Sequence, residues 1–194
     1  ESVKVSYFTI DGTGEWSNTK YVRSSNDVFL IFETARATLT AFRNAGPESA
    51  ALSPGIGQLI GAFKIEGRKS DSSAEPRLVT LRFQVSASAS VTLGDIRLRA
   101  DGTDTSFPCT AASAIITCAN IPSEFGVLGP EGRTLSVYAD VNLASSVGTQ
   151  FLRLSVNQAG TPADAGAVVW TDGTTTFDWL PFDTPVAQGT LYQI

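Results

Sequence analysis

Histidine and methionine are both absent from this chain of 194 residues. Without an imidazole there is no Ser-His-Asp or Cys-His nucleophile, no histidine general base and no His-rich zinc site, which removes the commonest routes to hydrolysis at neutral pH. Paired carboxylates could still serve a glycosidase, but nothing in the sequence brings together any two of Glu33, Glu66, Glu124 and Glu131. We therefore expect a protein that is not an enzyme.

Charged residues are scarce, at 17% of the chain, and the 14 basic ones are scattered. A net charge of -5 and an isoelectric point near 4.7 argue against nucleic-acid binding, which needs clustered lysine and arginine. Long apolar runs are missing as well: the longest mainly apolar stretch, residues 28–32, is far shorter than the roughly 20 residues of a membrane-spanning helix. The sequence predicts neither a nucleic-acid partner nor membrane insertion.

The chain contains two cysteines, Cys109 and Cys118, without the second pair and tight spacing of a zinc ribbon. Their separation suits a disulfide across a hairpin, whereas two buried free thiols would suit a reducing compartment. The low lysine and glutamate content favours the oxidising exterior. Because no methionine precedes Glu1, we also expect a processed terminus, and hence an extracellular or cell-surface protein.

Apolar and polar residues alternate with a period of two along most of the chain, and helical periodicity is scarce. The clearest case is residues 77–85, where Val79, Leu81, Phe83 and Val85 alternate with polar residues. About ten short strands separated by turn signals predict an all-β fold, an antiparallel β-sandwich that is Ig-like or jelly-roll-like in its layers. A helical turn is expected only at residues 47–52. The expected core comprises Phe29, Ile31, Phe63, Ile65, Val79, Leu81, Phe83, Ile96, Leu98, Val137, Val141, Leu152, Leu154 and Val169.

Residues 1–35 are interpreted as an N-terminal strand and linker, and residues 36–194 as the sandwich domain. The expected first strand, residues 2–10, is followed by a glycine-containing turn. Such a strand could be donated to the sheet of a neighbouring copy, where its side chains would fill pockets; alternatively, it is an ordinary first strand of its own sandwich. The side chains assigned to the assembly strand are Val3, Val5, Tyr7 and Ile10.

From about residue 36 onward, the pattern resembles a repeated β-sandwich domain of long bacterial cell-surface and surface-layer-type proteins. The resemblance rests on five segments, residues 59–66, 78–85, 91–98, 133–141 and 167–173. It implies an extracellular, non-enzymatic role in building or decorating a cell surface. The chain departs from a tandem array, because no second copy of the pattern is found in it.

Aspartates recur in turns, and clustered carboxylates with loop carbonyls are typical calcium ligands. The candidate calcium ligands are Asp101, Asp104, Asp172 and Asp178. None of these turns has the spacing of an EF-hand, and Asp-Gly is also ordinary turn chemistry. Apart from calcium, no cofactor is expected.

Three tryptophans, Trp16, Trp170 and Trp179, could stack on sugar rings if they were exposed, although core packing is the other interpretation. The sequence therefore leaves two functions open. The first is a structural subunit that assembles with copies of itself into a pilus-like filament or a surface layer through sheet-edge or donor-strand contacts. The alternative is a carbohydrate-binding or adhesin module that recognises a glycan.

Overall fold

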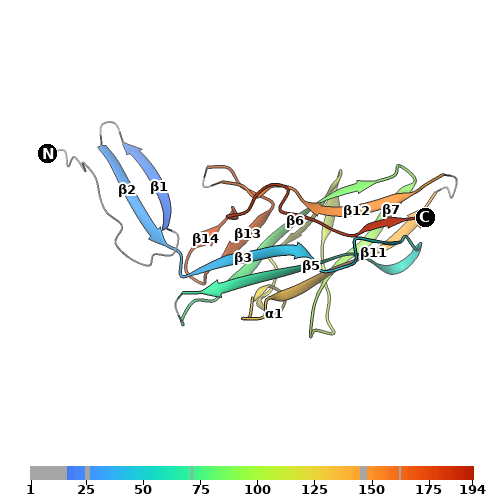
Figure 1. The fold of residues 1–194 in the computed structure, drawn as a ribbon, viewed down its shortest axis with the longest axis horizontal. Coiled ribbons are helices and arrows are strands. Elements are labelled where there is room, and N and C mark those ends of the chain that lie inside the picture. The colour runs from blue at the N-terminus through green and yellow to red at the C-terminus, as the bar shows by residue number, and fades with distance from the viewer. Residues whose placement is uncertain (1–16, 25–26, 71, 145–147, 162) are drawn as a thin grey trace.

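The computed structural model describes residues 17–24, 27–70, 72–144, 148–161 and 163–194. It is almost entirely β, with two sheets packed face to face, and so confirms the all-β sandwich (Figure 1). The expected strand at residues 2–10 lies outside the described residues.

The first layer is a five-stranded antiparallel sheet. Its strands, in spatial order, are β3 (Ala37–Asn44), β5 (Gly55–Lys69), β11 (Arg133–Leu143), β7 (Val91–Ala100) and β8 (Phe107–Pro108).

The second layer is a nine-stranded sheet, antiparallel except where β16 pairs with β4. Its main path runs through β14 (Thr176–Phe177), β13 (Val168–Thr171), β6 (Arg77–Ala87), β12 (Phe151–Val156), β16 (Leu191–Gln193) and β4 (Ser49–Ala51). The remaining strands are β9 (Thr110–Ala112), β10 (Ile115–Ala119) and β15 (Ala187–Gln188), of which β10 pairs with both β6 and β9, and β15 pairs with β12.

Aromatic side chains join the two layers at the centre of the core. Phe63 of β5 stacks on Phe83 of β6 with ring centroids 5.1 Å apart, and Phe42 of β3 packs against Phe63 at 5.9 Å. Most of the expected core is buried as predicted, whereas Phe29 and Ile31 lie outside the residues whose side chains the structure describes. The confirmed core residues are Phe63, Ile65, Leu81, Phe83, Ile96, Leu98, Val137, Val141, Leu152 and Leu154.

Two predicted core residues, Val79 and Val169, are only partly buried, and their placement in the core was wrong. Trp170 pairs with Leu78 while Val169 pairs with Thr80, so β6 holds one extra residue, Val79, at this point. A bulge of this kind changes which face successive side chains occupy. Leu78 and Trp170 are buried instead.

The predicted helical turn at residues 47–52 is also wrong, because this segment contains β4, which pairs in parallel with β16. The helix in the described structure is the single turn α1 (Ser123–Gly126), which follows Pro122. Phe125 of α1 is buried and packs 6.0 Å from the ring of Phe107. Residues 49–51 form a strand because they pair with β16, and α1 is anchored by the packing of one aromatic ring. Neither cause leaves a periodic pattern in the local sequence.

The N-terminal segment contains a separate hairpin, in which β1 (Ser17–Ser24) pairs with β2 (Asp27–Thr34) without any register shift. Among the residues that the structure describes, no strand pairing joins this two-stranded sheet to either layer of the sandwich. Figure 1 shows it in blue, beyond the end of the sandwich at which β3 begins. We refer to it as the N-terminal hairpin.

Candidate functional site

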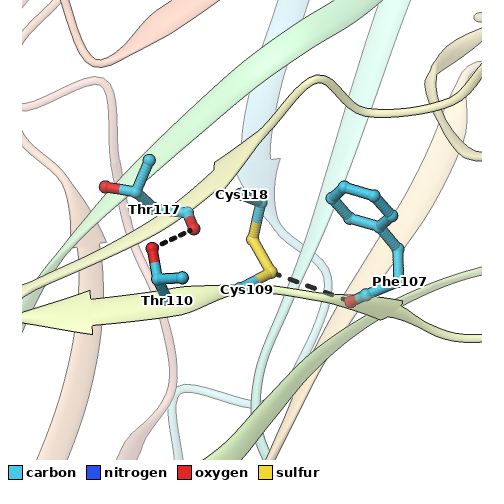
Figure 2. The surroundings of a disulfide bond; sticks show 5 residues. All are labelled: Phe107, Cys109, Thr110, Thr117 and Cys118. Carbon is cyan, nitrogen blue, oxygen red and sulfur yellow. Dashed lines mark hydrogen bonds between the residues drawn. A yellow bond between two sulfur atoms is a disulfide. The ribbon is translucent and has the colours of Figure 1, made fainter.

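The predicted disulfide between Cys109 and Cys118 is present, with the sulfur atoms 2.01 Å apart (Figure 2). Cys109 lies between β8 and β9, and its backbone N–H donates to the carbonyl of Ile96 in the five-stranded sheet. Cys118 lies in β10 opposite Leu81 of the nine-stranded sheet, and it is fully buried. The disulfide therefore ties the two layers together where the chain crosses from one to the other.

Asp172, in the turn between β13 and β14, is buried at 1% exposure. One carboxylate oxygen, Oδ1, accepts the backbone N–H groups of Thr174 at 2.8 Å and Thr175 at 2.7 Å. The other, Oδ2, accepts the N–H of Arg36 at 2.9 Å, immediately before β3. Asp172 thus joins the β13–β14 turn to the point where the N-terminal segment enters the sandwich.

The charge state of Asp172 follows from these contacts. Burial alone would raise the pKa of the carboxyl, but hydrogen bonds from the backbone of Thr175, Arg36 and Thr174 outweigh it, so the pKa of Asp172 lies below its ordinary value. With both oxygens occupied by the protein's own N–H groups, Asp172 acts as a structural acceptor.

The other three candidate calcium ligands do not form a metal-binding group with Asp172. The carboxylate of Asp101 accepts the N–H of Thr134 at 3.1 Å and forms an ion pair with Arg133 at 3.5 Å, while Asp104 and Asp178 are exposed. Within the part of the chain that the structure describes, no three acidic or cysteine side chains are grouped so as to hold a metal ion. The predicted calcium constellation is therefore not assembled.

The aromatic candidates occupy different environments. Trp170 is only 3% exposed, stacks on Phe177 with centroids 4.4 Å apart, and donates its Nε1–H to the carbonyl of Trp179 at 3.0 Å. It belongs to the core, so its proposed role in glycan stacking was wrong. Trp16 lies outside the described residues.

Trp179 is partly buried and is one of the residues that line a small, partly open apolar pocket of about 20 Å³ beside the start of β3. Its Nε1 is buried without a hydrogen-bond partner among the described residues. A pocket of this volume has room for about one water molecule. It is too small to hold a sugar ring. The walls are formed by Ala35, Ala37, Thr38, Trp170, Phe177, Trp179 and Pro181.

The structure reveals a surface that sequence reasoning did not predict. Ile56 is 85% exposed and Leu59 is 40% exposed, both near the start of β5. Leu59 pairs with Tyr138 of β11, and the guanidinium of Arg99 lies 4.7 Å from the centre of the Tyr138 ring. We call Ile56, Leu59 and Tyr138 the β5 patch. The one signal for it in the sequence is the isoleucine between two glycines in residues 55–57.

The sheet edges of the sandwich are poorly suited to pairing with another strand. β3 carries a bulge at Thr40, and β7 carries one next to Asp95, whose φ is 38°. The other strands at described sheet edges are two or three residues long; they are β4, β8, β9, β14 and β15. Bulges and very short strands are the usual means of preventing edge-to-edge association.

Comparison with protein-family models, curated proteins and solved structures found no match for this chain. Among the residues that the structure describes, no helix has the length and apolar character needed to cross a membrane.

Proposed function

We propose that this protein is a non-catalytic, extracellular structural subunit that assembles with copies of itself into a filament or surface layer through its N-terminal segment, residues 1–34. The observation that carries the proposal is that the described strands of this segment pair with each other and with neither layer of the sandwich. The described core between the layers is formed by residues from Ala37 onward.

The composition of the N-terminal hairpin supports an intermolecular role. An isolated two-stranded hairpin is marginally stable in water and needs a further surface to pack against. Residues 28–32 of β2 are five consecutive apolar residues, and successive residues of a strand lie on opposite faces. The sequence of β2 is therefore rich in residues that favour burial, and burying such side chains stabilises by roughly 1.5–3 kcal/mol each.

Strand regularity also favours this segment as the assembly element. Its two strands are eight residues long and pair without a bulge, whereas the described edges of the sandwich are bulged or short. Assembly through the N-terminal segment would thus be specific, because random edge pairing between sandwiches is discouraged. The cross-linked layers and the resemblance to bacterial surface domains fit a subunit that works outside the cell.

Negative-stain electron microscopy and light scattering on the full chain and on residues 35–194 test the proposal. We expect polymers or sheets from the full chain and folded monomers from the shorter one. Leu30→Pro tests the same segment without removing it, because proline lacks the N–H that a strand ladder needs. It should abolish assembly, whereas Leu30→Val, which keeps β propensity, should not.

Monomers from all of these proteins, with unchanged thermal stability, would contradict assembly and favour a monomeric binding module. Unfolding of residues 35–194 would show instead that the N-terminal segment belongs to the sandwich.

A further inference from the structure

The strands of the nine-stranded sheet contain no aspartate or glutamate. Their charged residues are three arginines, Arg77, Arg82 and Arg153. The strands of the five-stranded sheet do carry carboxylates, and three of the arginines in those strands form ion pairs with acidic residues. Although the net charge of the chain is -5, the strands of one layer are therefore free of acidic side chains.

Strand β6 turns polar side chains outward from this layer. Leu81 and Phe83 are fully buried in the core. Because successive residues of a strand lie on opposite faces, Arg82, Gln84 and Ser86 point away from the core, and all three are exposed.

The neighbouring strands extend this polar surface sideways. Gln84 pairs with Ser155 of β12, and Ser155 pairs in turn with Gln188 of β15. Ser86 pairs with Arg153, two residues before Ser155 on the same face of β12. We call this surface the arginine face. It consists of Arg82, Gln84, Ser86, Arg153, Ser155 and Gln188.

Both guanidinium groups of the arginine face are held by neutral acceptors. Nη1 of Arg82 donates to the carbonyl of Gly166 at 3.2 Å, and Nη1 of Arg153 donates to Oε1 of Gln188 at 3.3 Å. Nε of Arg153 is buried and has no hydrogen-bond partner among the described residues. Neither arginine forms an ion pair within the described part of the chain. Both charges can therefore pair with an anionic ligand, and the planar fork of a guanidinium matches a carboxylate.

The spacing of the two charges restricts the kind of anion. Arg82 lies four residues before Ser86, which pairs with Arg153, so the Cα atoms of the two arginines are roughly 14 Å apart at the usual strand rise and strand spacing. Uncharged amide and hydroxyl groups lie between them. A nucleic-acid strand carries a phosphate about every 3.4 Å, which is far denser than this face. A polysaccharide with carboxylates on separated sugars has anions at intervals and hydroxyl groups between them.

We infer that the arginine face is a binding site for an acidic polysaccharide whose carboxylates are separated by uncharged sugars. The carboxylates pair with the two guanidinium groups, and the sugar hydroxyls bond to the amide and hydroxyl side chains between them. All six side chains of the face are polar, whereas the centre of a protein interface is apolar and aromatic, so the face suits a glycan better than a protein. This site is separate from the N-terminal segment and does not depend on the proposed assembly.

Fluorescence anisotropy with labelled hyaluronan oligosaccharides, in which uronic acids alternate with uncharged sugars, tests the site on the full chain. Arg82→Gln with Arg153→Gln should weaken binding by about tenfold or more for each arginine, because a charge-assisted hydrogen bond contributes about this factor. The matched control is Arg97→Gln with Arg99→Gln, which changes the net charge equally but on β7 of the other sheet, and it should leave the affinity nearly unchanged. Uncharged chitin oligosaccharides should bind far more weakly than hyaluronan.

Arginine modification of the original chain gives a readout that needs no substitution. Phenylglyoxal reacts with accessible guanidinium groups, and mass spectrometry measures the reaction at each arginine. Hyaluronan should protect Arg82 from the reagent and leave Arg97, which is exposed on the other sheet, reactive. This measurement decides the question if the double variant fails to fold, which thermal unfolding checks.

Other outcomes would overturn the site. They are an absence of binding to both hyaluronan and polygalacturonate, an unprotected Arg82 in the presence of bound hyaluronan, and equal weakening by the two arginine pairs. Equally tight binding of single-stranded DNA would show a general polyanion surface and would also overturn it. If the substitutions at Arg82 and Arg153 instead change the concentration at which the chain assembles, the face is a contact between copies, and the proposed function stands without the glycan site.

Discussion

At the scale of single residues, Asp172 links the two ends of the described sandwich sequence. Its buried carboxylate accepts hydrogen bonds from three backbone N–H groups. That of Arg36 lies near the start of the sandwich sequence, and those of Thr174 and Thr175 lie near its end. Charged acceptors of buried N–H groups contribute more than neutral ones, and their removal leaves the donors unsatisfied.

Asp172→Asn should lower the free energy of unfolding at neutral pH by about 2–3 kcal/mol, because an amide offers a weaker acceptor and brings donors of its own. Urea unfolding measures the effect. Asp178→Asn, at an exposed aspartate nearby, is the control and should change little. Equal, small effects of both substitutions would contradict the structural role of Asp172.

The same contacts predict a pH dependence. Since the folded-state pKa of Asp172 is lowered, its stabilising contribution is complete above the pKa of the unfolded chain, near 4, and is lost as the pH falls through the lower, folded-state pKa. The difference in unfolding free energy between the original chain and Asp172→Asn should therefore shrink below about pH 4. A difference that stays constant down to pH 2 would show that the carboxylate charge does not matter.

Reasoning from the sequence singled out Asp172 and left calcium binding and ordinary turn chemistry open, and the structure shows the turn hydrogen bonds. The Asp-Gly-Thr pattern marks a turn and a carboxylate, yet the third donor, Arg36, comes from 136 residues away and is set by the tertiary fold. Core packing of Trp170 was one of the two interpretations that the sequence left open, and the bulge at Val79 sets the register in which Trp170 pairs with Leu78.

At the scale of elements, the disulfide connects one sheet to the other. The chain leaves the five-stranded sheet after β8 and enters the nine-stranded sheet at β9, with Cys109 between them and Cys118 on β10. Because it spans two layers, the link opposes their separation as well as the opening of one hairpin.

Reduction of the disulfide should lower the free energy of unfolding by about 2.5–3 kcal/mol, the loop-closure value for cysteines nine residues apart. Denaturant unfolding with and without reductant measures the change. A variant with both Cys109→Ala and Cys118→Ala should be insensitive to reductant. An unchanged midpoint after verified reduction of the original chain would contradict a stabilising role.

The element scale also shows where sequence patterns are informative. A long alternating strand such as residues 77–85 was predicted because one of its faces is buried, and this leaves a period of two. Strands of two or three residues, such as β4, β14 and β15, carry no periodicity, and they form only because a neighbouring strand offers them hydrogen bonds. Bulges could not be predicted from the sequence for the same reason, because they carry no periodic pattern of their own.

At the scale of the whole molecule, the sandwich and the N-terminal hairpin are distinct in strand pairing, and the proposed assembly follows from this separation. From the sequence, the N-terminal segment is predicted to have an assembly role, and its expected strand at residues 2–10 lies outside the described residues; the sequence could not reveal the β5 patch. That surface is apparent only when β5 and β11 lie side by side and Gly57 bonds to Asp140.

Hydrogen exchange of the full chain across a concentration series tests this account most directly, because it reports backbone protection segment by segment. We expect the amides of β2 to exchange quickly in dilute solution and to become protected as concentration rises, while the amides of β5, β6 and β11 stay protected throughout. Strong protection of β2 that is independent of concentration would contradict the account, because the N-terminal hairpin would then be stabilised by its own chain.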